Sequence, residues 1–265
     1  MSKTRVHDIE IAYEDEGSGP PVVLLHGYPF NRSMWDDQTQ ALRNSQRVIV
    51  PDLRGHGESE VAEATIEAMA RDIGGLMTSI GISEAAIGGL SMGGYVALAF
   101  YRLYPERVRA LVLADTRASA DTDEVKQNRR KQAERALSEG MEGIANDLLP
   151  KLLSPHTLEK RAEIVDRVRQ MMVETKPEGA AAALKAMGER NDQTDLLSRI
   201  VAPTLILVGR DDVITPVKDS ESMHRVIEGS HLEVIEGAGH VSNVEQPEQF
   251  NRVLLNFLLD GNPAE

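Results

Sequence analysis

The stretch AAIGGLSMGGYVALAFYRL, residues 85–103, decides the fold of this chain. Residues 85–90 form a short continuous apolar run, which is typical of a strand buried on both faces of a sheet. Residues 92–103 continue with the apolar spacing of a helix. Between them, Gly89-Leu90-Ser91-Met92-Gly93 matches G-x-S-x-G, a motif that requires a sharp turn from a strand into a helix.

This turn makes Ser91 the candidate nucleophile. We predict that the chain reversal forces Ser91 into a strained backbone conformation and holds its hydroxyl above the edge of the sheet. Glycine at positions 89 and 93 avoids a collision of side chains across the turn. The helix that begins at Met92 directs free N–H groups and the positive end of its dipole toward the same space.

Outward from this stretch, buried apolar runs alternate with amphipathic helices. The predicted strands are a pair within residues 4–15 and single strands at 22–26, 47–52, 85–90, 109–115, 204–209 and 231–237. The predicted helices lie at residues 33–43, 65–80, 92–103, 216–227 and 247–259. This alternation predicts an α/β fold, with a mostly parallel sheet and helices on both of its faces.

One long segment interrupts this alternation. Residues 117–193 contain no buried strand run and are rich in Glu, Lys, Arg, Ala and Met. We interpret them as several helices, inserted after the sixth strand at the edge where open α/β sheets bind ligands. The predicted domains are therefore a core of residues 1–116 and 194–265 and a helical lid of residues 117–193. Four methionines either line an apolar pocket under the lid or belong to its core: Met141, Met171, Met172 and Met187.

Composition limits the classes of partner and the compartment. The 265 residues carry a net charge of −13, without the basic stripe that nucleic acids or anionic membranes require, so neither is an expected partner. The chain has no cysteine, which fits a reducing cytoplasm. It shows neither a signal peptide nor a membrane helix. We therefore predict a cytoplasmic protein, with a frayed end at residues 260–265.

A serine hydroxyl needs a base to remove its proton, and that base needs an orienting carboxylate. After this motif, the acid and then the histidine each follow a later strand. His240, in EGAGH (236–240), is the candidate base. Asp211, Asp212 and Asp115 all stand at the ends of predicted strands, and spacing alone leaves the three open as the acid. Thr215 followed by Pro216 has the pattern of a helix N-cap.

Acyl transfer also needs N–H donors for the oxyanion that forms in the reaction. The Met92 N–H is one candidate by its position after Ser91. The Tyr28 N–H, in the loop that follows the strand at 22–26, is the other. We interpret His26 in the same loop as a buried residue bonded to the backbone. This chemistry calls for no metal and no cofactor.

Five motifs stand in the order in which the α/β-hydrolase family carries them. They are HGYP (26–29), PDLRGHGES (51–59), GLSMGG (89–94), GRDDVITP (209–216) and GAGH (237–240). The chain resembles this family over nearly its whole length. Within the family it is most similar to serine esterases, enol-lactonases and cofactor-free haloperoxidases, which act as perhydrolases.

The resemblance implies the α/β-hydrolase fold and assigns roles to individual residues. The family's acid motif, G-x-x-D-x-x-x-P, selects Asp212 as the acid, with Ser91 as nucleophile and His240 as base. Tyr28 and Met92 correspond to the oxyanion donors. The implied activity is cleavage of small to medium carboxylic esters or lactones through an acyl-enzyme on Ser91. The alternatives are a ligand receptor that retains the triad, a perhydrolase, and a carbon–carbon bond hydrolase.

Overall fold

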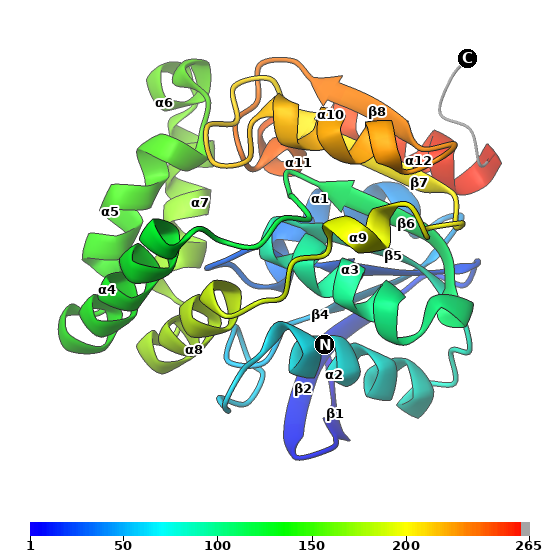
Figure 1. Cartoon of the computed structure of the whole chain (residues 1–265), viewed down its shortest axis with the longest axis horizontal. Coiled ribbons are helices and arrows are strands. Elements are labelled where there is room, and N and C mark those ends of the chain that lie inside the picture. Colours follow the sequence, from blue (N-terminus) through cyan, green and yellow to red (C-terminus); the bar gives the residue numbers. More distant parts are fainter. Residues whose placement is uncertain (261–265) are drawn as a thin grey trace.

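The computed structural model describes residues 1–260 and places eight strands in one sheet, in the order β1-β2-β4-β3-β5-β6-β7-β8 (Figure 1). The strands are β1 (Ser2–Val6), β2 (Ile9–Glu16), β3 (Pro21–Leu25), β4 (Arg47–Pro51), β5 (Ala85–Leu90), β6 (Val108–Ala114), β7 (Thr204–Gly209) and β8 (His231–Ile235). β2 pairs antiparallel with β1 and β4, and the other neighbours are parallel. The predicted α/β fold with a mostly parallel sheet is confirmed.

The helices fall into two groups. Those that accompany the sheet are η1 (Arg32–Trp35), α1 (Asp36–Leu42), α2 (Ile66–Ser79), α3 (Met92–Leu103), η2 (Pro105–Arg107), α10 (Val217–Val226), α11 (Ser242–Glu245) and α12 (Pro247–Asp260). Those between β6 and β7 are α4 (Asp123–Glu139), α5 (Met141–Leu152), α6 (Pro155–Lys160), α7 (Ala162–Val173), α8 (Pro177–Gly188) and α9 (Thr194–Leu197). In Figure 1, α4 to α8 form one green to yellow-green group beside the sheet.

The strands read as continuous apolar runs because both faces of the sheet are covered. Along β3, Val23 and Leu25 join the hydrophobic cluster of α2 and α3, whereas Val22 and Leu24 join the cluster of α1 and α12. This is the two-residue alternation of a strand, repeated here with apolar residues on both sides. The core is thus two apolar layers with the sheet between them.

The parallel register also decides where polar side chains meet. Ser91, Asp115 and Asp212 follow the carboxyl ends of β5, β6 and β7, and His240 lies in the loop after β8. Because these four strands are parallel, their carboxyl ends lie at one edge of the sheet.

No helix of residues 1–260 is both long enough and apolar enough to cross a membrane. Of the end predicted to fray, residues 261–265 lie outside the described part of the chain.

Candidate active site

The turn between β5 and α3 holds Ser91 in the strained conformation that the sequence predicts. Its φ of 54° and ψ of −111° lie in a region that residues other than glycine rarely adopt. The turn leaves no room for side chains beside it. A Cβ at position 89 would lie 2.1 Å from the Gly93 carbonyl oxygen, and one at position 93 would lie 2.1 Å from the Leu25 carbonyl oxygen. Both positions therefore require glycine.

Three of the predicted site residues form one hydrogen-bonded chain. His240 Nε2 lies 2.8 Å from Ser91 Oγ, and His240 Nδ1 lies 2.8 Å from Asp212 Oδ2. All three side chains are buried. In this arrangement the serine hydroxyl donates to the imidazole, whose other nitrogen donates to the carboxylate, so the imidazole is placed to receive the hydroxyl proton.

Asp212 is held by the residues that directly follow it. Its Oδ1 accepts hydrogen bonds from the Ile214 and Thr215 N–H groups, at 2.8 and 3.0 Å. Its Oδ2 accepts a bond of 2.7 Å from Thr215 Oγ1, which also lies 3.3 Å from His240 Nδ1. The N-cap role predicted for Thr215 is wrong, because α10 begins only at Val217. The Thr215 hydroxyl donates instead to the Asp212 carboxylate, three residues earlier in the chain.

The two other acid candidates lie elsewhere. Asp211 is exposed next to Asp212, and only its backbone N–H is engaged, with the Ala238 carbonyl. Asp115 is fully buried, and its oxygens accept bonds of 2.8 Å from the Gly209 N–H and 2.5 Å from Ser242 Oγ. Neither aspartate is hydrogen bonded to His240 within the described residues. Asp115 instead ties the end of β7 to the start of α11, two residues after His240.

Burial and close charges shift the pKa values of this cluster in opposite directions. Burial lowers the pKa of the His240 imidazole, but the neighbouring Asp212 carboxylate raises it more, and the net pKa lies above the ordinary 6.5. Burial raises the pKa of Asp212, but the His240 charge and the hydrogen bonds bring it below its ordinary value. Burial and the Asp212 charge raise the pKa of Asp115 to about 8. Asp212 is therefore the ionised partner of His240, whereas burial and the Asp212 charge favour the protonated form of Asp115.

The helical segment of residues 117–193 contacts the loop that carries His240 and holds it in place. The His240 N–H donates to the Leu152 carbonyl at 2.8 Å. The buried Glu245 carboxylate accepts from the Gly239 N–H at 2.6 Å and from the Ser154 N–H at 2.8 Å. The sequence does not predict this role of Glu245, because nothing next to it in the chain indicates that the carboxylate is buried and binds Ser154.

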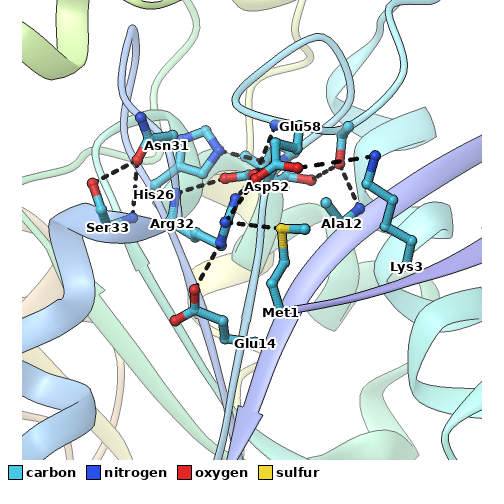
Figure 2. Close-up of polar contacts among 12 residues, drawn as sticks. Met1, Lys3, Ala12, Glu14, His26, Asn31, Arg32, Ser33, Asp52 and Glu58 are labelled. Atoms are coloured by element: carbon cyan, nitrogen blue, oxygen red, sulfur yellow. Dashed lines mark hydrogen bonds and ion pairs between the residues drawn. The ribbon is translucent and has the colours of Figure 1, made fainter.

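A polar network holds the loop after β3 next to Ser91. His26 Nδ1 donates to the Gly27 carbonyl at 2.9 Å, and His26 Nε2 accepts from the Leu53 N–H at 3.0 Å. Burial lowers the pKa of His26 to about 4, so the ring is neutral, as expected for a structural residue. Further along the loop, Arg32 binds the Asp52 carboxylate (Figure 2). The Arg32 backbone N–H donates to Asp52 Oδ1 at 2.7 Å, and Arg32 Nη1 donates to Asp52 Oδ2 at 2.5 Å. The loop is thus anchored on both sides of Tyr28.

The two candidate oxyanion donors flank the nucleophile. A Cβ placed on Gly27 would lie 3.4 Å from Ser91 Cβ, so the Tyr28 backbone passes directly beside the serine. Met92 is the first residue of α3. Within residues 1–260, neither the Tyr28 nor the Met92 N–H donates a hydrogen bond to another group of the protein. Both donors are therefore available to a bound oxygen atom.

A small cavity opens onto this site. Its volume is about 70 Å³, and it is lined by Tyr28, Ser91, Tyr95, Arg129, Gln132, Leu148, Leu152, Met187, Ile214 and His240. Of the four methionines considered, Met187 lines this cavity, whereas Met141, Met171 and Met172 are buried in the hydrophobic clusters. Among the described residues, no group of three His, Cys, Asp or Glu side chains is arranged to hold a metal ion.

Comparison with known proteins shows the family and the fold. Residues 20–247 match the family model described as the alpha/beta hydrolase fold. The chain is 31% identical to 3-oxoadipate enol-lactonase 2 of Acinetobacter baylyi, over 93% of this chain and 92% of the relative. The structure of a thermophilic esterase from Thermogutta terrifontis, with malate bound, is 45% identical with a TM-score of 0.95 and covers 97% of this chain and 98% of its own. An enol-lactonase structure from Burkholderia xenovorans LB400 is 29% identical with a TM-score of 0.92 and covers 98% of this chain and all of its own.

Proposed function

The chain belongs to the α/β-hydrolase family, and from that premise we propose that it is a serine hydrolase that cleaves small carboxylic esters and lactones. The observation that carries the proposal is the hydrogen-bonded chain from Ser91 Oγ through His240 to Asp212, with 2.8 Å at each step. Esterases and enol-lactonases, named among the similar proteins, supply the substrate class.

The mechanism follows from the positions of these groups. Ser91 Oγ attacks the ester carbonyl while His240 Nε2 accepts its proton, and Asp212 stabilises the imidazolium that results. The N–H groups of Tyr28 and Met92 bind the oxyanion of the tetrahedral intermediate. His240 then protonates the leaving alcohol, and an acyl-enzyme remains on Ser91. Water, activated by the same imidazole, releases the acid and restores the serine.

The segment of residues 117–193 acts in this proposal as a lid. Its residues Arg129, Gln132, Leu148, Leu152 and Met187 form one wall of the cavity. The core, residues 1–116 and 194–265, supplies the triad and both oxyanion donors. Because the chain has no cysteine, it needs no oxidising compartment, and we place the enzyme in the cytoplasm.

A panel of p-nitrophenyl esters and lactones, assayed on the wild-type protein and on Ser91→Ala, tests the proposal. Fast repeated turnover that depends on Ser91 supports a hydrolase. A single slow turnover would instead indicate a ligand receptor that retains the triad. Peracid formation and carbon–carbon bond cleavage, measured in the same panel, separate the perhydrolase and carbon–carbon hydrolase alternatives.

We expect a preference for short acyl chains. The cavity of about 70 Å³ is much smaller than the roughly 300–1,000 Å³ of pockets for larger ligands. Forcing a longer chain into filled space typically costs about 1–3 kcal/mol, so kcat/KM for p-nitrophenyl octanoate should be about 5- to 150-fold below that for the acetate. Leu148→Ala, which removes cavity wall, should reduce this difference. Equal rates for both esters in the wild-type protein would contradict the expectation.

We also expect a characteristic dependence on pH. The reaction needs neutral His240, whose pKa lies above 6.5, so kcat/KM should rise with pH through a midpoint above that value. Asp115, with its pKa near 8, titrates in the same range and affects the same imidazole, which makes the rise shallower than a one-proton curve. A pH series from 5 to 10 in buffers of constant ionic strength measures both features.

Asp115→Asn provides the control for this pH series. The variant should restore a one-proton shape without abolishing activity, because only the second titrating group is removed. A midpoint below 6.5 in the wild-type protein would show that the Asp212 carboxylate does not raise the pKa of His240.

A further inference from the structure

Besides Tyr95 of α3, three polar side chains line the catalytic cavity but take no part in the triad. Tyr28 comes from the loop after β3, and Arg129 and Gln132 come from α4. Residues three apart on a helix lie on the same face, so Arg129 and Gln132 stand next to each other on one side of α4. No acidic residue is among those lining the cavity. Its polar wall beyond Ser91 and His240 therefore consists of groups that can donate hydrogen bonds.

The Tyr28 hydroxyl has no partner in the described part of the chain. The side chain is 8% exposed, and its oxygen is buried without a hydrogen bond. A buried hydroxyl in this state costs free energy that a bound acceptor would recover. Burial raises the pKa of Tyr28, while the Arg129 charge acts in the opposite direction, which places the two groups close together. The hydroxyl is thus a buried donor without an acceptor, on a residue that lines the cavity.

Arg129 is fixed at one nitrogen, and within the described residues its other nitrogens meet no strong acceptor. Its Nε donates to Asp121 at 2.5 Å, and its Nη1 meets only the Met187 sulfur, at 3.5 Å. Met187 lines the cavity too, so this outer end of the guanidinium lies at the cavity wall. Thioether sulfur is a weak acceptor. The part of Arg129 nearest the cavity can therefore bind a further, stronger acceptor.

Arg129 shares its carboxylate partner with two other arginines. Asp121 is shared by three guanidinium groups, since Arg190 Nη1 lies 2.8 Å and Arg117 Nη2 3.1 Å from the same carboxylate that binds Arg129. Arg190 also lies over the Tyr95 ring, 4.0 Å from its centre, and that ring lines the cavity.

Two further aspartates lie near the other two arginines, so three carboxylates face three guanidinium groups. Asp219 lies near Arg117, and Asp192 lies near Arg190. Arg129 has no carboxylate partner besides Asp121 in residues 1–260. Arg129 thus shares its one carboxylate partner with Arg117 and Arg190, whereas each of those two has a second aspartate nearby.

We propose that Tyr28 Oη, Arg129 and Gln132 form a subsite for a carboxylate group of the substrate. The natural substrates are then short esters or lactones that carry a free carboxylate, such as half-esters of small dicarboxylic acids. A guanidinium binds a planar carboxylate through two parallel hydrogen bonds, and a hydroxyl and an amide can donate to its remaining lone pairs. The inference rests on the proposed function, because it adds recognition to the same Ser91 site.

The test compares pairs of esters that match in shape and differ in charge. With the carboxylate on the acyl side, monomethyl succinate is compared with methyl levulinate, in which a methyl ketone replaces the carboxylate. With the carboxylate on the alcohol side, acetoxyacetate is compared with acetoxyacetone. A pH-stat measures kcat/KM for the wild-type protein, Arg129→Gln, Arg129→Lys, Tyr28→Phe and Arg130→Gln. Tyr28→Phe keeps the backbone N–H, and Arg130, exposed on the same helix, serves as the matched charge control.

We expect the wild-type protein to prefer the charged ester in at least one pair. Arg129→Gln should lower that preference by roughly 10- to 100-fold, the range for losing a hydrogen bond to a charged group, with little change for the neutral ester. Arg129→Lys should keep part of the preference, Tyr28→Phe should lower it less, and Arg130→Gln should leave it unchanged. Two arginines remain on Asp121 in the Arg129 variants, so that carboxylate stays paired.

Two results would overturn the subsite. One is a wild-type protein that shows no preference for the charged ester in either pair. The other is a preference that Arg129→Gln leaves intact or, if that variant does not fold, one that Tyr28→Phe leaves intact. Failure of the proposed function itself looks different, because none of the four esters would then be cleaved in a manner that depends on Ser91.

Discussion

Ser91→Ala is expected to lower kcat for p-nitrophenyl acetate by about 10⁵- to 10⁶-fold, the scale of nucleophile removal in serine hydrolases. In the proposed mechanism, the hydroxyl at 2.8 Å from His240 Nε2 is the group that forms the acyl-enzyme. Without it the imidazole has no nucleophile to activate, and only the oxyanion donors and substrate binding remain. Alanine can occupy this turn as serine does, because both carry a Cβ at the same strained φ of 54°. The loss should therefore be chemical, with the fold retained.

Steady-state kinetics together with circular dichroism separates these two effects. Ser222→Ala is the matched control, since Ser222 is exposed on α10 and its hydroxyl bonds only to the Lys218 carbonyl of the same helix. That variant should match the wild-type protein. If folded Ser91→Ala still turned over the ester at more than about a hundredth of the wild-type rate, another group would be the nucleophile.

The sequence could predict those parts of the site that depend on strand ends. Ser91, Asp212 and His240 each follow a buried strand, and parallel strands bring such positions to one edge. The predicted family and fold are confirmed for the same reason, because the motifs mark successive strand ends along the chain. Spacing could not choose among the three aspartates, because all of them stand at this edge. The resemblance selected Asp212, and in the structure it is Asp212 that is hydrogen bonded to His240.

Other features depend on contacts between distant segments, for which the chain carries no local signal. The composition of residues 117–193 predicts several helices, but it does not indicate that Arg129 and Gln132 of α4 line the same cavity as Ser91. The role of Glu245 depends on Ser154, a residue 91 positions away. Thr215 shows the opposite failure. Its local pattern predicts a helix N-cap, but its hydroxyl donates to the Asp212 carboxylate, and α10 begins only at Val217.

Asp212→Asn is expected to lower kcat by about 10⁴-fold, as loss of this carboxylate does in Ser-His-Asp proteases. The reason lies in the geometry of the site. Asp212 Oδ1 accepts two backbone N–H bonds, so the oxygen of an asparagine would take that position and its NH₂ would face His240 Nδ1. Nδ1 would then have to accept a hydrogen bond, the ring proton would move to Nε2, and Nε2 could no longer accept the proton of Ser91.

Asp115→Asn is the comparison that makes this prediction specific. Its two oxygens bind the Gly209 N–H and Ser242 Oγ, not the imidazole. An asparagine can accept the first bond and donate the second to a reoriented hydroxyl, so we expect a loss of less than about tenfold. Rates at the pH optimum and thermal unfolding of both variants measure the difference. Comparable losses in two folded variants would mean that the buried carboxylates share the acid role. A large loss with Asp212→Asn alone would mean that the acid role requires a direct hydrogen bond to His240. A buried carboxylate that is only nearby, as Asp115 is, would then not be sufficient.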